Sequence, residues 1–352
     1  MTGNDSGLAT RILTWAASHG RKDLPWQQRI SPYRVWVSEI MLQQTRVDTV
    51  IPYFERFMKR FPEVADLASA PLDTVLAYWA GLGYYARVRN LHKAAGLIAS
   101  ADRFPDSLES LCKLPGIGRS TAGAILSVGF RKPSAILDGN VKRVLTRMYA
   151  IEGWPDDTRV KRELWRLSEQ HTPEQDCREY AQAIMDLGAT VCTRHNPNCA
   201  GCPLSSDCIA FAHGRTRELP SPRQRKTMPV KSCTLLLLRN RDGHCYLVKR
   251  PPVGIWGGLW GLPEFSSKQD TIEWCAKSGA SNLQWWPRQR HTFSHYHLDY
   301  TPVVAEWLNP GNYVREEEPG LWCDPADNSH LALPAPIKRL VDRLRLDSQN
   351  FG

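Results

Sequence analysis

The sequence predicts a chain of two domains, of which the first is all-helical and the second combines strands with helices. Three observations lead to this prediction. The 352 residues exceed the usual length of a single domain. Apolar residues recur at helical spacing up to about residue 210, whereas short runs typical of strands begin near residue 233. Residues 212–230 separate the two patterns and predict a basic linker, with five Arg or Lys residues and three prolines between Arg215 and Pro229.

Composition and charge indicate a globular protein with a polyanionic partner. The chain is 42% hydrophobic and 23% charged, which are ordinary globular values. Its net charge of +9 and pI of about 9.1 favour a polyanion. No apolar run approaches the roughly 20 residues of a membrane span, and the first residues lack the features of a signal peptide. We therefore expect a cytoplasmic protein with reduced thiols, whose ten cysteines form no disulfide framework.

The first domain begins with a series of amphipathic helices. A proline at residue 32 stands where the first turn of a helix tolerates it and marks the start of the second helix. Residues 104–107 then cap a short helix that leads into a glycine-containing turn. Helical spacing of apolar residues predicts helices at residues 8–20, 32–44, 46–61, 72–80, 87–100, 158–170 and 174–190.

Glu39 is the unusual residue of the second helix. Val35, Trp36, Ile40 and Leu42 surround it at helical spacing, and no Lys or Arg stands three or four positions away. An apolar wall raises the pKa of a carboxyl group, which suits a general acid near neutral pH. The same spacing is also compatible with an ordinary glutamate that faces solvent.

A tight turn with two glycines joins the next two helical patterns. Gly116 and Gly118 flank Ile117, which we expect to pack inward as the anchor of the turn. The helix that opens at Arg119 and Ser120 has free N–H groups at its start, which can bind a phosphate without reading a base. An ordinary helical hairpin would contain the same glycines, and helical hairpins are common.

The turn and a later acidic residue together resemble a known superfamily. Leu-Pro-Gly-Ile-Gly is followed about 20 residues later by Leu-Asp-Gly-Asn, a pattern that resembles the helix-hairpin-helix DNA glycosylases. Their catalytic aspartate matches Asp138. The run Val-Trp-Val-Ser-Glu-Ile-Met-Leu-Gln-Gln-Thr is similar to the signature of the adenine DNA glycosylases, the MutY family. This resemblance implies that Glu39 is the catalytic acid and that Gln43 and Gln44 probe the base pair.

A short loop with two tyrosines follows the helix predicted at 72–80. Aromatic side chains beside an arginine, here Arg87, can wedge into or stack on nucleic acid. Two core tyrosines at a helix junction would have the same sequence. The resemblance to the adenine DNA glycosylases places a wedge tyrosine at Tyr84.

Four cysteines close together predict a metal or cluster site. Their spacing is C-x6-C-x2-C-x5-C, and only one pair forms the Cys-x-x-Cys hook that zinc sites usually use twice. Zinc remains an alternative, for which His195 could compete as a ligand, but one compact loop with four thiolates fits a [4Fe–4S] cluster. The spacing is similar to the cluster loop of endonuclease III and the adenine DNA glycosylases. The resemblance implies a [4Fe–4S] cofactor held by Cys192, Cys199, Cys202 and Cys208.

The second domain begins with two predicted strands, 233–239 and 244–249, joined by a hairpin turn. Residues 257–265 then resemble a Nudix domain. The acidic helix motif that holds magnesium in Nudix hydrolases is missing, since Glu273 is a single acid where several are needed. We therefore expect recognition rather than hydrolysis. A strand near 299–307 and a helix at 335–345 complete the domain.

Residues 291–297 contain three alternating histidines. This pattern suggests zinc on one face of a strand, although a polar strand face explains it without a metal. In the adenine DNA glycosylases the matching loop reads 8-oxoguanine. The resemblance therefore implies that Phe293, Ser294 and His295 perform this recognition here.

Together these patterns predict a helix-hairpin-helix glycosylase domain with a [4Fe–4S] loop (192–208) at residues 1–211, a linker at 212–230 and a Nudix-like α/β recognition domain at 231–348. We expect a base excision repair enzyme that hydrolyses the N-glycosidic bond of adenine mispaired with 8-oxoguanine or guanine in duplex DNA. We also expect a monomer in the cytoplasm, associated with the nucleoid in a bacterium.

The chemistry can be argued from the residue types. A base inside a duplex must be flipped out before it is attacked. Cleavage then needs one carboxyl group to protonate the leaving base and another to meet an oxocarbenium-like centre. Glu39 would protonate adenine N7, Asp138 would stabilise or capture the sugar cation, and Asn140 would orient Asp138.

Two alternative functions remain in view. A bifunctional glycosylase/lyase such as endonuclease III carries a Schiff-base lysine at the position of Ser120, and a hydroxyl group cannot form an imine. Lys142 stands near Asp138 in sequence and would give at most weak trapping. A non-enzymatic lesion-binding protein would have no need of both Glu39 and Asp138.

Overall fold

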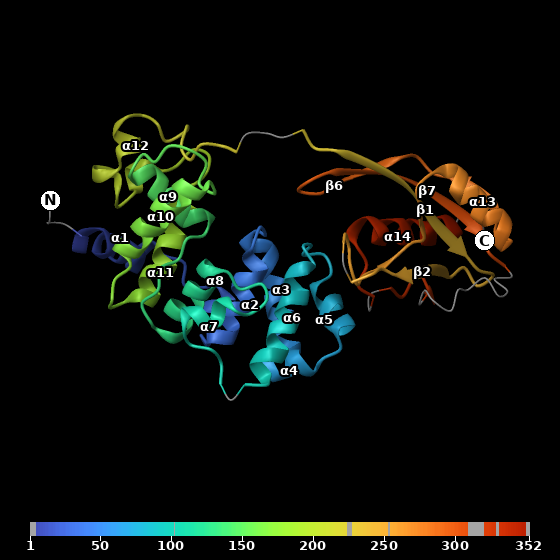
Figure 1. Cartoon of the computed structure of the whole chain (residues 1–352), viewed down its shortest axis with the longest axis horizontal. Helices are drawn as coiled ribbons and strands as arrows, with labels where there is room; N and C mark the ends of the chain where they lie inside the picture. The colour runs from blue at the N-terminus through green and yellow to red at the C-terminus, as the bar shows by residue number, and fades with distance from the viewer. Residues whose placement is uncertain are drawn as a thin grey trace. The chain divides into compact units, whose positions relative to one another are not determined.

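The computed structural model of the chain describes residues 5–101, 103–223, 227–252, 254–308, 320–328 and 331–349 (Figure 1). The chain divides into two compact units. The first consists of Met1–Ser69 and Asn90–Gln224, and the second of Ala70–Arg89 and Arg225–Gly352. The predicted domain limits at residues 211, 231 and 348 are a different division of the chain and stay a prediction.

In the first unit all the regular elements of the described residues are helices, as the spacing of apolar residues predicts. The helix predicted at 174–190 begins at Cys177 and continues beyond Asp186 as a π-helical turn, Leu187–Val191. The helices of this unit are α1 (Asp5–His19), α2 (Pro32–Leu42), α3 (Val47–Arg60), α4 (Val64–Ser69), the larger part of α6 (Ala86–Ala99), α7 (Leu108–Cys112), α8 (Arg119–Ala124), α9 (Gly139–Met148), α10 (Thr158–His171), α11 (Cys177–Asp186) and α12 (Ile209–Ala212).

Helix α2 forms the centre of one group of helices in this unit. Ser31 caps its N-terminus by accepting a hydrogen bond from the Arg34 N–H, and Pro32 occupies the first turn. The helix packs against α3, α8 and the π-helical turn Ile125–Gly129. Trp36 is fully buried there, and burial of so large an apolar side chain stabilises the core by roughly 2–3 kcal/mol.

A second group of helices contains α1, α9, α10, α11 and α12 (Figure 1). Helix α9 contacts α10, α11 and α12, and α1 contacts α10 and α11. Asp138 caps the N-terminus of α9. The turn before α8 and the start of α9 are 20 residues apart in the chain, and both belong to the first unit.

The second unit is built on a mixed sheet. The strand order is β3-β2-β1-β7-β5, with β4 paired to β1, β6 to β7 and β8 to β2. Strands β1 and β7 run parallel and the other pairs are antiparallel. The strands are β1 (Val230–Arg239), β2 (Cys245–Lys249), β3 (Trp260–Gly261), β4 (Glu264–Phe265), β5 (Ser281–Trp285), β6 (Gln289–Thr292), β7 (His297–Glu306) and β8 (Gly320–Cys323).

Three helices accompany this sheet: α5 (Leu72–Trp79), α13 (Lys268–Ser278) and α14 (Ala335–Gln349). Cys275 of α13 packs with Leu236 of β1 and Val303 of β7 in a buried cluster. The predicted hairpin of the first two strands is confirmed, because β1 and β2 pair antiparallel around the turn at 240–243. The strand predicted near 299–307 corresponds to β7, and the helix predicted at 335–345 corresponds to α14.

Two details of the second unit differ from expectation. Residues 291–297 are not one strand, so the interpretation as a polar strand face is wrong. His291 lies in β6 and His297 opens β7, and the Phe293 N–H donates to the Tyr296 carbonyl at 2.9 Å across the loop between them. Helix α13 also contains Asp270 besides Glu273, so Glu273 is not its single acid.

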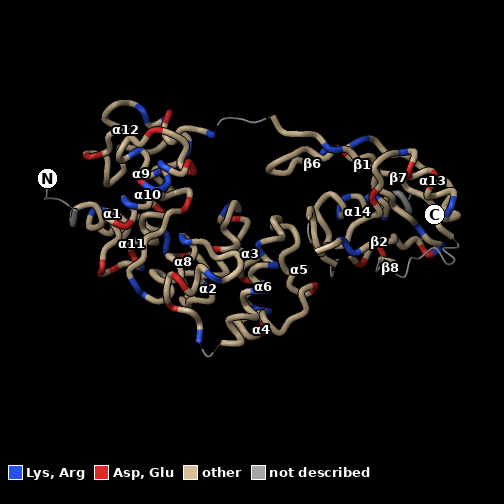
Figure 2. The backbone as a smooth tube through the Cα atoms, in the orientation of Figure 1, with Lys and Arg blue, Asp and Glu red and all other residues tan. Residues whose placement is uncertain are grey.

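Charged side chains are distributed over both units (Figure 2). The blue Lys and Arg positions are interspersed with red Asp and Glu positions on most helices. Within the described residues, no helix combines the length and the apolar character needed to cross a membrane.

Candidate active site

A cavity of about 530 Å³ lies in the first unit between α2, α8 and the start of α9. Residues from segments far apart in the chain line it, because α2 packs against α8 and α9 packs against the turn Leu187–Val191. The cavity brings together six of the residues that the sequence predicts as site residues: Glu39, Gln43, Gln44, Ser120, Asp138 and Asn140.

Glu39 reaches this cavity from an apolar part of α2. Val35, Leu42 and Val128 line the cavity with it. Among the described residues, no group donates a hydrogen bond to its carboxyl. Burial raises its pKa to about 8, and the charge of Asp138 contributes a smaller increase. The structure therefore does not support the alternative that Glu39 is an ordinary glutamate on the solvent-facing side of α2.

Asp138 has the opposite surroundings. Its Oδ1 accepts hydrogen bonds from the N–H groups of Asn140 (3.1 Å) and Val141 (2.8 Å), and its Oδ2 accepts from Asn140 Nδ2 at 2.9 Å. Burial raises its pKa, while these three donors and the nearby Arg143 guanidinium act to lower it. The helix cap thus favours the ionised form of Asp138 next to a glutamate that receives no such bonds.

Arg143 connects Asn140 to the cysteine-rich loop. Its Nη2 donates to Asn140 Oδ1 at 2.9 Å and to the Gly188 carbonyl at 2.5 Å, and its Nε donates to the Cys192 carbonyl at 2.6 Å. Arg143 was not identified from the sequence. The available signal was an arginine one helical turn after Asn140, but the carbonyls of Gly188 and Cys192 are more than 40 positions away.

The hairpin supplies Ser120 and the turn before α8. Ser120 Oγ accepts a hydrogen bond from the Leu137 N–H at 3.0 Å, which ties the hairpin helix to the residue before Asp138. Ile117 is 4% exposed, so its predicted inward packing is confirmed. Gly116 has φ +80°, and a Cβ there would lie 2.8 Å from Asn90 Cβ.

Gly118 differs from Gly116. Its φ of −88° is accessible to any residue, so the backbone conformation of the turn does not require glycine at this position. A Cβ at Gly118 would meet no atom of the described chain within 4 Å. Its small size leaves the start of α8 open to an incoming group.

The two glutamines lie at the end of α2. Gln43 Nε2 donates to Thr121 Oγ1 at 3.5 Å, which links α2 to the hairpin helix. Gln44 has φ +58°, a left-handed conformation that is uncommon for a side chain of this kind. Such outliers often occur at functional positions.

Tyr84 belongs to the second of the two units into which the chain divides. It is 49% exposed and has φ +50°. The Arg87 guanidinium lies 5.3 Å from its ring centroid. Tyr85 is 8% exposed. The alternative of two core tyrosines is therefore correct for Tyr85 and incorrect for Tyr84.

The four clustered cysteines lie between α11 and α12. Burial and, to a smaller extent, the charges of the other three thiols raise the pKa of Cys202 to about 11, so the four sulfur atoms are close enough to interact. The described residues contain no group of three or more His, Cys, Asp or Glu side chains arranged to hold a single metal ion. The remaining six cysteines are free, as expected for ordinary residues.

A buried cation adjoins these thiols. Arg147 is 2% exposed, and its Nη1 lies 3.3 Å from Cys192 Sγ. Its other partners are the carbonyls of Thr193, Arg194 and Leu219, and no carboxylate in the described part of the chain pairs with it. A buried guanidinium needs a compensating charge. Four thiolates, or a cluster bound by them, would supply it, so the residues fit an anionic [4Fe–4S] centre.

The loop between β6 and β7 presents Ser294 and His295 to solvent. Phe293 is half-buried, with its ring 4.8 Å from Tyr296 and 5.4 Å from Trp256. The Arg250 guanidinium lies 5.8 Å from the Trp256 ring centroid. Trp256 was not identified from the sequence, because nothing local relates it to a loop 37 residues later.

Comparisons with known proteins find two family models that match successive parts of the chain. A model of the HhH-GPD superfamily of base excision DNA repair proteins matches residues 37–170, and a NUDIX domain model matches residues 234–343. The adenine DNA glycosylase of Buchnera aphidicola (subsp. Acyrthosiphon pisum) is 36% identical over 95% of this chain and 96% of its own. The human adenine DNA glycosylase is 34% identical over 84% of this chain and 69% of its own.

Solved structures resemble the helical part. A thermostable thymine-DNA glycosylase superposes with a TM-score of 0.54 at 25% identity, covering 59% of this chain and 97% of its own. An endonuclease III, in a non-covalent DNA complex, has a TM-score of 0.50 at 20% identity and covers 61% of this chain and all of its own. The latter similarity concerns the fold alone.

Proposed function

Since the chain belongs to the adenine DNA glycosylases, we propose that it hydrolyses the N-glycosidic bond of adenine mispaired with 8-oxoguanine or guanine in duplex DNA. The observation that carries this proposal is the pairing of Glu39 and Asp138 in one cavity. One carboxyl has a pKa of about 8 and the other is held by three hydrogen-bond donors. Glycosidic cleavage needs one protonated and one ionised carboxyl group.

The reaction begins with a flipped base. Adenine leaves the duplex stack and enters the cavity, since its glycosidic bond cannot be reached inside the helix. Glu39 donates its proton to adenine N7, which makes the base a better leaving group. As the bond from C1′ breaks, positive charge develops on the sugar, and the Asp138 carboxylate stabilises it or forms a covalent intermediate. Water then completes hydrolysis at C1′ and leaves an abasic site.

Asn140 and Arg143 hold Asp138 ready for this role. The Asn140 amide donates to Asp138 and accepts from Arg143, so its orientation is fixed from both ends. A carboxylate that is already oriented needs no rearrangement as the sugar charge develops. Gln43 and Gln44 line the same cavity and are suited to contact the base pair from which adenine leaves.

Ser120 and Lys142 argue for hydrolysis without strand cleavage. The Ser120 hydroxyl cannot form an imine and already accepts the Leu137 N–H. The Lys142 amine is already engaged in an ion pair with Asp156 at 2.5 Å. We therefore propose a mainly monofunctional glycosylase.

Two further elements would bind the substrate duplex, and a third would hold a loop of the first unit in place. The N–H groups of the turn from Gly116 through Gly118 to Ser120 suit a phosphate, and the exposed Tyr84 suits a wedge between bases. Four thiolates from Cys192, Cys199, Cys202 and Cys208 would hold a [4Fe–4S] cluster, which would fix the 192–208 loop in place.

The Nudix-like unit would recognise the partner base. 8-Oxoguanine carries a proton on N7, whereas guanine N7 is an acceptor, so the Ser294 hydroxyl can distinguish the two by accepting a hydrogen bond. His295 would contact the neighbouring backbone or base edge, and Phe293 would fix the loop. Recognition of the partner base is needed because adenine is an undamaged base and does not itself mark the mispair.

The direct test is base release by the whole protein. Single-turnover assays on duplexes with adenine opposite 8-oxoguanine, guanine or thymine should show excision from the first two and little from the third. Equal excision from all three duplexes would contradict recognition of the partner base. Absence of released adenine from every duplex would contradict the glycosylase assignment itself.

A further inference from the structure

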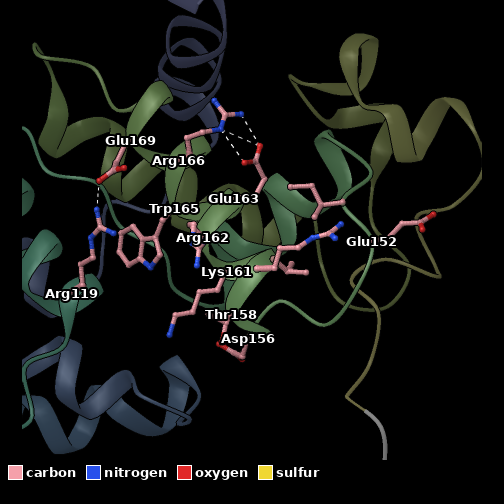
Figure 3. Close-up of a pocket in the computed structure, with 13 residues that line it drawn as sticks. Arg119, Glu152, Asp156, Thr158, Lys161, Arg162, Glu163, Trp165, Arg166 and Glu169 are labelled. Carbon is pink, nitrogen blue, oxygen red and sulfur yellow. Dashed lines mark hydrogen bonds and ion pairs between the residues drawn. The ribbon is translucent and has the colours of Figure 1, made fainter.

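A groove of about 940 Å³ lies on the first unit beside the active-site cavity (Figure 3). Helix α10 contributes most of its lining, the loop before that helix contributes Glu152 and Asp156, and the hairpin helix contributes Arg119. None of these residues has a role in the excision chemistry described above.

Every carboxylate in the lining already has a cationic partner. Within α10, Glu163 pairs with Arg166 at 2.7 Å. The other three pairs are formed across the chain, between Glu169 and Arg119, between Glu152 and Arg215, and between Asp156 and Lys142.

Three cations of α10 are left without such a partner. Arg159, Lys161 and Arg162 line the groove and are exposed, and within the described parts of the chain no carboxylate pairs with any of them. Figure 3 shows the labelled Lys161 and Arg162 among the groove side chains, close to Trp165. The groove therefore has a net positive charge that the protein does not neutralise, which suits a polyanion.

Arg119 joins this groove to the hairpin. It is the first residue of α8, its guanidinium lies 4.1 Å from the Trp165 ring centroid, and it pairs with Glu169 of α10 (Figure 3). The groove thus begins beside the backbone N–H groups at the start of α8, which suit a phosphate.

Lys142 and Asp156 join the groove to the active-site cavity. Lys142 lines the cavity, and its ion-pair partner Asp156 lines the groove. A strand whose flipped nucleotide occupies the cavity and whose phosphate meets the hairpin would have its next phosphates in front of α10.

We propose that this groove binds the phosphodiester backbone of the substrate strand beside the excised nucleotide, with Lys161 and Arg162 as its main contacts. This inference rests on the proposed function and extends its DNA footprint. Continuity with the hairpin and the cavity favours a nucleic acid over an acidic protein segment, which would have no reason to lie against either. Contacts of this kind add affinity without reading sequence.

The test is the salt dependence of duplex binding by the full-length protein. The dissociation constant for a duplex with adenine opposite 8-oxoguanine would be measured between about 0.1 and 0.4 M salt, where charges farther apart than about 10 Å are screened. The double variant Lys161→Ala with Arg162→Ala should lower the magnitude of the log–log slope by about 2, close to 1 for each lost phosphate contact.

The matched control is Arg131→Ala with Glu179→Ala, an exposed ion pair that lines neither the groove nor the cavity. It also removes two long side chains but preserves net charge, so its slope should equal that of the wild type. Circular dichroism would establish that both variants are folded. A wild-type slope in the Lys161/Arg162 variant would overturn the groove proposal, and an acidic protein partner would give this result. Failure of the wild-type protein to bind the duplex would instead overturn the proposed function.

Discussion

At the residue scale, the chemistry depends on how differently Glu39 and Asp138 are surrounded. Glu39 receives no hydrogen bond from the described residues, whereas Asp138 receives three. Burial raises the pKa of both groups, but only Asp138 has donors and a nearby guanidinium that oppose the shift. In the proposed mechanism Glu39 is therefore the proton donor and Asp138 the charge stabiliser.

The raised pKa of Glu39 predicts a pH dependence of excision. The acid must be protonated to donate, and its pKa is about 8. The single-turnover rate constant should therefore be nearly constant from about pH 6 to 7, fall to half near pH 8, and be roughly tenfold lower near pH 9. Rate measurements under saturating enzyme would show this alkaline decline. A constant rate up to about pH 9.5 would contradict the role of Glu39 as the acid.

At the scale of elements, the loop between β6 and β7 forms the predicted reader of the partner base. The Phe293 N–H closes the loop onto the Tyr296 carbonyl, and Ser294 and His295 stay exposed at its tip. A loop on a rigid scaffold is a common place for recognition, because its backbone is fixed while its tip remains accessible.

This arrangement predicts a selective effect of Ser294→Ala with His295→Ala. The variant should slow excision opposite 8-oxoguanine by about 10-fold or more, because loss of one such contact costs ~1–3 kcal/mol of discrimination. Excision opposite guanine should stay near the wild-type rate. Single-turnover rates on the two duplexes would be compared side by side. An unchanged ratio of the two rates would remove this loop from recognition.

Trp256 predicts a second effect on the same element. Its ring packs against His291 and Phe293 at 5.8 and 5.4 Å, so it supports the loop without reaching its tip. Trp256→Ala should lower the 8-oxoguanine preference and accelerate amide hydrogen exchange at Phe293 and its neighbours. Trp256→Phe should retain most of both properties. Unchanged exchange in Trp256→Ala would show that the loop does not depend on this ring.

The elements also show which features a sequence can predict. The hairpin and its anchor Ile117 depend on a few neighbouring residues, so local patterns identify them. Asp138 was named through the resemblance to the glycosylases, and its role as a helix cap was not predicted. Arg143 and Trp256 act through contacts with segments 35 to 49 positions away, which only the folded chain brings together. The histidine-containing stretch at 291–297 was misinterpreted as a single strand because alternation there continues through a turn.

At the scale of the whole molecule, the proposed function assigns excision to the first unit and recognition to the second. The first unit contains the cavity with both carboxyls and the four clustered cysteines, and the second contains the mixed sheet with the β6–β7 loop. The change to strand patterns near residue 233 predicted a helical part followed by a part with strands, which the secondary structure confirms. The pairing of a cavity residue with a groove residue, Lys142 with Asp156, was not predictable from sequence.

The cysteine loop predicts the metal content of the purified protein. The four thiols and the buried Arg147 guanidinium fit an anionic cluster, so anaerobically prepared protein should be brown, absorb near ~400 nm and contain about four irons per chain. Metal analysis of the whole protein would check this. Stoichiometric zinc without iron would contradict the cluster assignment while leaving the glycosylase assignment intact.

The central claim is that Glu39 and Asp138 excise adenine together, and single-turnover excision by Glu39→Gln and by Asp138→Asn tests it most directly. Each variant nearly preserves the shape of the side chain and removes its ability to donate a proton or carry a charge. The rate constant for adenine opposite 8-oxoguanine should fall at least ~100-fold in each variant, while the dissociation constant for the duplex stays close to that of the wild type. Excision at a near-normal rate by either variant would contradict the account.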